Sequence, residues 1–272
     1  MEIPAKVNSQ PRQPPSSVVN SWGAAFRPTL LFVVTFAISM TPHEAVHAIT
    51  SYLLGFSSTL FHLWVNPDPA EATSKQLAII AAAGPIFSLA VGATCWILYQ
   101  WRFQRRPSGL MLLMLAIVGV YAFLGPLAGS ALGGDFNIAF TFLGVSKTVR
   151  YALSATGFVL LPCFMFFMGK ELMRWAPRNF GRAKAVACAT VAPWLIGTGL
   201  ILLVYWPLPS FLISSTLAGS AFWVFAVVGA AFGFSTFRPA ESISSFTRSD
   251  LILAGVALAM VRLLVNGVRL AH

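Results

Sequence analysis

The chain has 272 residues, of which 57% are hydrophobic and only 10% are charged. Soluble domains carry about 45–50% apolar and about 25% charged residues, so this chain cannot cover a water-facing surface of its size. Intrinsic disorder is excluded for the opposite reason, because disordered chains have low hydrophobicity. A mean hydropathy of +0.76 agrees with an integral membrane protein. Long apolar runs without alternation indicate transmembrane helices rather than a barrel.

The net charge of +10 comes from 18 Lys and Arg against 8 Asp and Glu. In a soluble protein such a balance suggests nucleic-acid binding. Here the basic residues stand in short loops between apolar runs, where they set membrane orientation, so we expect the lipid bilayer and no nucleic acid as a partner. Cys95, Cys163 and Cys188 lie inside apolar runs without CxxC spacing, which indicates neither disulfides nor a thiolate metal site.

Residues 1–25 are polar and rich in Pro, Ser and Gln, and no apolar segment follows a basic start there. We expect a flexible tail rather than a cleaved signal peptide. The first span should then run from about residue 27 to 55. After it, residues 58–65 have strand character and Asn-Pro-Asp-Pro at 66–69 is a turn signal. These features predict a short hairpin at the membrane surface.

Six more spans follow, each near the ~20 residues needed to cross the hydrocarbon. They are predicted at about 77–100, 108–131, 148–173, 186–206, 213–234 and 250–268. The charged residue Arg262 lies inside the last predicted span. If that segment does not cross the membrane, the number of spans is six. The sequence therefore predicts an all-α polytopic, multi-pass membrane protein with about six to seven transmembrane helices. If the source is prokaryotic, the expected location is the cell membrane.

One motif with metal-binding spacing lies inside the first span: His43-Glu44-Ala45-Val46-His47, an HExxH. On a helix, positions i and i+4 lie on the same face, so the two imidazoles can bind one zinc ion with the Glu beside it. An ionisable side chain within a span is costly and indicates a functional site. Of the eight carboxylates, only Glu44 lies well inside a span.

Asp135 follows the third span, after Gly133-Gly134. The third span returns to the side on which the first one ends, so Asp135 and the HExxH half of the first span should meet. A zinc hydrolase needs three protein ligands and an open position for water. We expect His43, His47 and Asp135 as the ligands and Glu44 as the general base. The plain alternative is that both imidazoles are polar core residues bonded across helices.

The HExxH in a span, Ala82-Ala83-Gly84-Pro85 in the next, and an Asp after a Gly-rich stretch resemble the site-2 protease family of intramembrane zinc metalloproteases. The resemblance covers about residues 26–150, the expected protease-like core, and leaves residues 151–272 as accessory transmembrane helices. It implies zinc on His43, His47 and Asp135, water activation by Glu44, and a membrane-anchored protein or peptide as substrate.

The family often has an Asn after the Gly-Pro motif that assists substrate binding. Ser88 stands near that place here, and Asn137 is a second candidate for substrate binding or transition-state support, with helix capping as its plain alternative. Seven spans put 13 of the 18 basic residues on the side of the N-terminus, which predicts a cytoplasmic N-terminus and a site near the opposite face. The family places its sites nearer the cytoplasm, so orientation stays open.

The sequence therefore predicts an intramembrane zinc metalloendopeptidase, in which the strand-like residues 58–65 could hold an unwound substrate by edge pairing. One alternative is an ion or substrate transporter, which should carry polar residues over several spans. The other is an inactive scaffold of the same fold.

Overall fold

The computed structural model describes residues 21–68, 72–104, 106–177, 180–234 and 248–271. Most of the tail predicted for residues 1–25 lies outside these ranges. So do five of the 13 basic residues in the charge count: Lys6, Arg12, Arg105, Arg178 and Arg238. Residues 21–25, predicted as the end of the tail, already belong to the first helix.

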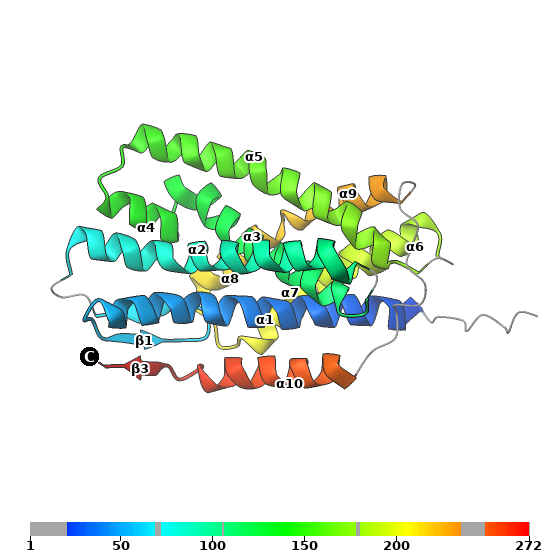
Figure 1. Cartoon of the computed structure of the whole chain (residues 1–272), viewed down its shortest axis with the longest axis horizontal. Helices are drawn as coiled ribbons and strands as arrows, with labels where there is room; N and C mark the ends of the chain where they lie inside the picture. The colour runs from blue at the N-terminus through cyan, green and yellow to red at the C-terminus, as the bar shows by residue number, and fades with distance from the viewer. Residues whose placement is uncertain (1–20, 69–71, 105, 178–179, 235–247, 272) are drawn as a thin grey trace, which may run out of the picture.

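The described chain is a bundle of helices with one small sheet (Figure 1). The α-helices in chain order are α1 (Ser21–Leu53), α2 (Ser74–Leu98), α3 (Gly109–Ala128), α4 (Asp135–Phe142), α5 (Lys147–Leu172), α6 (Arg182–Val186), α7 (Thr198–Val204), α8 (Ser210–Ser220), α9 (Trp223–Gly233) and α10 (Arg248–Leu263). Short π- or 3-10-helical segments continue or join them: η1 (Tyr99–Phe103), η2 (Gly129–Ala131), η3 (Met173–Trp175), η4 (Ala187–Val191) and η5 (Pro193–Gly197).

Among the described residues, six helical stretches are long and apolar enough to cross a membrane. They are residues 23–53, 74–103, 109–131, 147–175, 182–204 and 210–233. Each lies within a few residues of a predicted span, because a continuous apolar run fixes both the helix and its length. The all-α polytopic class predicted from the sequence is confirmed.

The last predicted span, residues 250–268, differs in length. Helix α10 has 16 residues, fewer than the ~20 that a full crossing needs. The chain turns after Leu263 and ends in a strand, β3 (Val268–Leu270). In the first turn of α10, Asp250 forms a buried ion pair with Arg27 of α1 at 3.0 Å. The Arg27 guanidinium also donates to the Pro107 carbonyl.

The hairpin predicted after the first span is present, but its turn lies elsewhere. Strand β1 (Ser58–Leu60) pairs antiparallel with β2 (Val65–Pro67), so Asn66 and Pro67 lie in a strand and the Asn-Pro turn prediction was wrong. Proline is tolerated there because β2 is an edge strand. Strand β3 pairs with the other side of β1, and the order of the sheet is β2-β1-β3.

Helix α1 lies between the sheet and α10 on one side and α2 on the other (Figure 1). Helices α2 and α3 approach closely through glycines. A Cβ at Gly119 would come within 2.8 Å of the Gly92 backbone, so neither position has room for a side chain. This contact between small residues, usual in membrane bundles, fixes the position of α2 in the bundle.

Candidate metal centre

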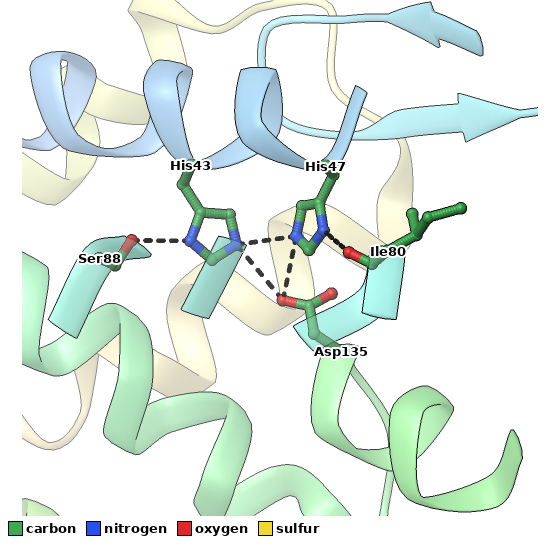
Figure 2. Close-up of polar contacts among 5 residues, drawn as sticks. All are labelled: His43, His47, Ile80, Ser88 and Asp135. Atoms are coloured by element: carbon green, nitrogen blue, oxygen red, sulfur yellow. Dashed lines mark hydrogen bonds and ion pairs between the residues drawn. The ribbon is translucent and has the colours of Figure 1, made fainter. Parts of the chain in front are cut away.

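The two histidines of the HExxH project from one face of α1 toward α2 and α4 (Figure 2). Their rings are buried, and their Nε2 atoms lie 3.2 Å apart. Pro42 precedes His43, but α1 continues through it to Leu53, so the i and i+4 spacing holds. The local sequence is therefore sufficient to bring the two imidazoles together.

Asp135 reaches the same point from a different part of the chain. Helix α3 ends in the η2 turn, and Gly134 then adopts a φ of 85°, which L side chains rarely adopt. Asp135 follows as the first residue of α4. Its Oδ2 lies 3.3 Å from His43 Nε2 and 3.7 Å from His47 Nε2. The chain is therefore not helical at the Gly-Gly pair, and this break lets Asp135 turn inward.

Helix α4 is held in this position by contact with α2. Ala139 of α4 packs against Ala78 and Ala81 of α2 in a small buried cluster. Figure 1 shows α4, the start of α2 and the sheet at the same end of the bundle. The expectation that Asp135 and the HExxH half of α1 share one side is therefore met within the fold.

The Nδ1 atom of each histidine ring has a partner on α2 (Figure 2). His47 Nδ1 donates to the carbonyl oxygen of Ile80 at 2.6 Å, and His43 Nδ1 lies 2.9 Å from Ser88 Oγ. Because a neutral imidazole carries one proton, donation from Nδ1 leaves the Nε2 lone pair of His47 free to face the centre. Metal-binding histidines are usually oriented by such a bond from the other nitrogen.

Gly84 makes room for both rings. A Cβ at this position would lie 2.7 Å from His43 Nε2 and closer still to His47 Nε2. Three small residues recur every four positions on α2, namely Gly84, Ser88 and Gly92, and each has a different role. Gly84 admits the imidazoles, Ser88 orients His43, and Gly92 contacts α3.

His43, His47 and Asp135 form a group able to hold a metal ion, and we call them the ligand triad. Burial alone would raise the pKa of the Asp135 carboxyl, but the hydrogen bonds with His43 and His47 outweigh burial and hold it below its ordinary value. Asp135 is thus an anion at neutral pH, which suits a cation ligand.

Glu44 and two members of the triad, His43 and Asp135, line one cavity of about 240 Å³. His47 lies one turn further along α1, outside the lining of this cavity. Glu44 thus lines the same cavity as two members of the triad without belonging to the triad itself. The cavity continues away from the triad along α1 and is lined mainly by apolar residues.

The two other candidates, Ser88 and Asn137, do not line the cavity, and a third histidine, His62, is not part of the triad. Ser88 is behind His43 and does not line the cavity, so its place is that of an orienting residue. Asn137 Nδ2 donates to the Ser130 carbonyl at 3.0 Å and so ties α4 to η2. His62 is buried elsewhere, with its Nε2 2.9 Å from the Tyr205 carbonyl oxygen.

Sequence reasoning missed the contribution of Ile80, which acts through a backbone carbonyl that residue identity cannot reveal. It also missed the cavity walls supplied by α7, α8 and α9, since these helices carry no charged motif. No protein-family model, curated protein or solved structure matches this chain. The function is therefore argued from the site itself.

Proposed function

We propose that the protein is an intramembrane zinc metalloendopeptidase that hydrolyses peptide bonds of membrane-anchored substrates. One observation carries the proposal: His43 Nε2, His47 Nε2 and Asp135 Oδ2 converge with separations of 3.2, 3.3 and 3.7 Å, and Glu44 lies beside them on a cavity wall. Two imidazoles, one carboxylate and a free carboxylate form the set of groups that zinc hydrolysis requires.

The donor set fits zinc in both chemistry and spacing. Zinc binds imidazole nitrogen at about 2.0–2.1 Å and carboxylate oxygen at about 2.0–2.2 Å, which puts tetrahedral ligands about 3.3–3.5 Å apart. The triad distances scatter closely around this value. With no metal, the two Nε2 atoms at 3.2 Å would face each other with at most one shared proton.

A bound zinc ion would supply a water of pKa about 7 and polarise the scissile carbonyl. Glu44 would accept the proton of that water and deliver it to the leaving amine, which requires an ionised carboxylate with no metal bond of its own. Ser88 and the Ile80 carbonyl would hold the imidazole rings of His43 and His47 in the orientation that metal binding needs. The remaining side of the triad opens onto the cavity, where the substrate carbonyl would enter.

The position of the site along α1 supports a substrate within the membrane. His47 is six residues before the end of α1 at Leu53, or about 9 Å at about 1.5 Å per residue. The centre is therefore sunk below one end of the bundle. The sheet lies on the other side of α1, and both edges of β1 are occupied by β2 and β3. These facts favour the cavity over β1 edge pairing as the place of the substrate.

Metal analysis of the purified full-length protein tests the proposal. We expect about one zinc per chain, and loss of most of it in Asp135→Ala, because that variant removes one of three ligands. Ile138→Ala is the matched control, since Ile138 lies in the same helix with its side chain exposed and outside the triad, so this variant should keep its zinc. Unchanged metal content in Asp135→Ala would contradict the proposed ligand set. Zinc binding without cleavage of any membrane-embedded reporter would favour an inactive scaffold.

A further inference from the structure

One face of the small sheet is polar and looks away from the bundle. Along β1, Ser58 and Leu60 are buried against α1, so Thr59 between them points to the opposite face. In the register of the sheet, Thr59 lies opposite Asn66 of β2 and opposite Arg269 of β3, and paired residues share a face. A row of three polar side chains therefore crosses all three strands on the outer face.

Asp68 adds a negative charge to this face. Its backbone N–H donates to the Ser57 carbonyl at 2.9 Å, which continues the pairing of β1 and β2 by one step. Asp68 comes two residues after Asn66, so both side chains point to the same side of an extended chain. The outer face is hollowed, with a cavity of about 350 Å³, at the small end of the range of about 300–1,000 Å³ for ligand sites. The cavity is lined by Ser57, Ser58, Thr59, Asn66, Asp68 and Arg269.

The cavity holds two opposite charges that do not meet. The chain positions of Arg269 and Asp68 are separated by β1, which puts them at least about 10 Å apart at about 4.8 Å per strand. Both side chains are exposed, and neither forms an ion pair with any described residue. A simple anion or cation would be attracted by one of these groups and repelled by the other. A ligand that carries both charges on one short group would be attracted by both.

The sheet lies at the height of the lipid headgroups. Helix α1 has 33 residues, or about 50 Å at about 1.5 Å per residue, whereas the hydrocarbon layer is about 30 Å thick. The ends of α1 therefore extend into the headgroup layers. Strand β1 lies beside the last turns of α1, where the Ser58 hydroxyl donates to the Ala48 carbonyl (Figure 1). Because the inner face of the sheet packs on α1, its polar outer face looks sideways, toward lipid.

We propose that the outer face of the sheet binds the zwitterionic headgroup of a phosphatidylethanolamine-type lipid. The Arg269 guanidinium binds the phosphate, with the Thr59 hydroxyl beside it as a second donor, and the Asp68 carboxylate accepts hydrogen bonds from the ammonium. A primary ammonium fits this site better than choline, because choline has no N–H to donate. The acyl chains meet apolar surface on α10, where Leu258 and Leu263 precede β3 and are 46% and 76% exposed.

Native mass spectrometry of the full-length protein, released from detergent micelles, tests the site. The probes are dioleoyl lipids with the same acyl chains and an ethanolamine, choline or glycerol headgroup. We expect the ethanolamine lipid to bind about 2- to 5-fold more tightly than the other two, as one exposed charge contact provides. Equal affinity for all three lipids would overturn the proposal, because such binding needs only acyl chains and a phosphate.

Three charge variants assign the two ends of the headgroup. Asp68→Asn should lower the affinity for the ethanolamine lipid to that for the choline lipid, which it should leave unchanged. Arg269→Gln should weaken binding of all three lipids, because the phosphate is common to them. Lys75→Gln is the control, since it also removes an exposed positive charge but lies on α2, on the other side of α1, and all three affinities should stay as in the wild type. An ethanolamine lipid that binds Asp68→Asn as tightly as the wild type would overturn the proposal.

Free phosphoethanolamine distinguishes a lipid from a soluble zwitterion as the ligand. It carries the same two charges but no acyl chains, so at the same concentration it should not displace the ethanolamine lipid. If free phosphoethanolamine binds as tightly as the lipid, the site takes a soluble zwitterion and the lipid proposal is overturned. None of these measurements depends on zinc or on peptide cleavage, so the lipid site and the peptidase stand or fail separately.

Discussion

The hydroxyl of Ser88 on α2 lies 2.9 Å from the Nδ1 atom of His43 on α1. This bond connects a residue without metal chemistry of its own to a member of the ligand triad. Ser88 is only 2% exposed, so no bulk water can replace it. The serine stands near the place where site-2 proteases often carry an Asn, but it faces the back of the imidazole rather than the cavity.

Removal of this hydroxyl should weaken metal binding without abolishing it. In Ser88→Ala the Nδ1 atom of His43 loses its partner. Loss of such an orienting bond typically costs 10- to 100-fold in metal affinity. Competition with a chelator of known zinc affinity measures the effect. Ser214→Ala is the control, because the Ser214 hydroxyl is exposed and donates only to its own helix. Equal zinc affinity in both variants would refute the orienting role.

Gly84→Ala should reduce zinc binding more than Ser88→Ala does. The added methyl would overlap both imidazole rings, so the triad must open or α2 must move away from α1. We expect loss of most bound zinc, measured as metal per chain after purification. Gly199→Ala in α7 is the control, since nothing lies within 4 Å of a Cβ at that position. Full zinc content in Gly84→Ala would show that the two helices are not packed as described.

Much of this centre could be predicted from the sequence because its constraints are local. The i and i+4 spacing of His43 and His47 needs only a helix, and apolar run length gives the spans. Asp135 could be added because the number of crossings fixes the side on which it returns. The hairpin turn was misplaced, since Pro67 tolerates an edge strand as well as a turn and only β-sheet pairing distinguishes them.

The cavity was beyond sequence reasoning for a different reason. Its walls combine residues of α1, α3, α7, α8 and α9, and the side chains that form them are ordinary apolar residues. Nothing in the sequence distinguishes Thr198, whose hydroxyl has no hydrogen-bond partner among the described residues, from Thr190, whose hydroxyl donates to the Val186 carbonyl. That difference appears only when the helices are packed together.

Glu44→Gln separates chemistry from metal binding. Glutamine keeps the size and polarity of the side chain but cannot accept a proton from water, so cleavage of a membrane-embedded reporter should fall by orders of magnitude. Zinc content should stay at about one per chain, because Glu44 is not a member of the triad. Full activity of Glu44→Gln would contradict the proposed role of Glu44 as general base. Loss of zinc together with activity would instead indicate that Glu44 has a structural role.

The membrane orientation can be determined with two single-cysteine variants in a background without Cys95, Cys163 and Cys188. Ser74→Cys reports on the start of α2 and Leu143→Cys on the end of α4, and both positions are exposed. Because α4 packs against the first turns of α2, an impermeant thiol reagent should reach both from the same side of intact cells. Labelling of both from outside would support the charge distribution, and labelling of both only after lysis would support the site-2 protease resemblance. Labelling of the two cysteines from opposite sides would mean that Asp135 cannot share a metal with His43 and His47. This result would contradict the proposed metal centre.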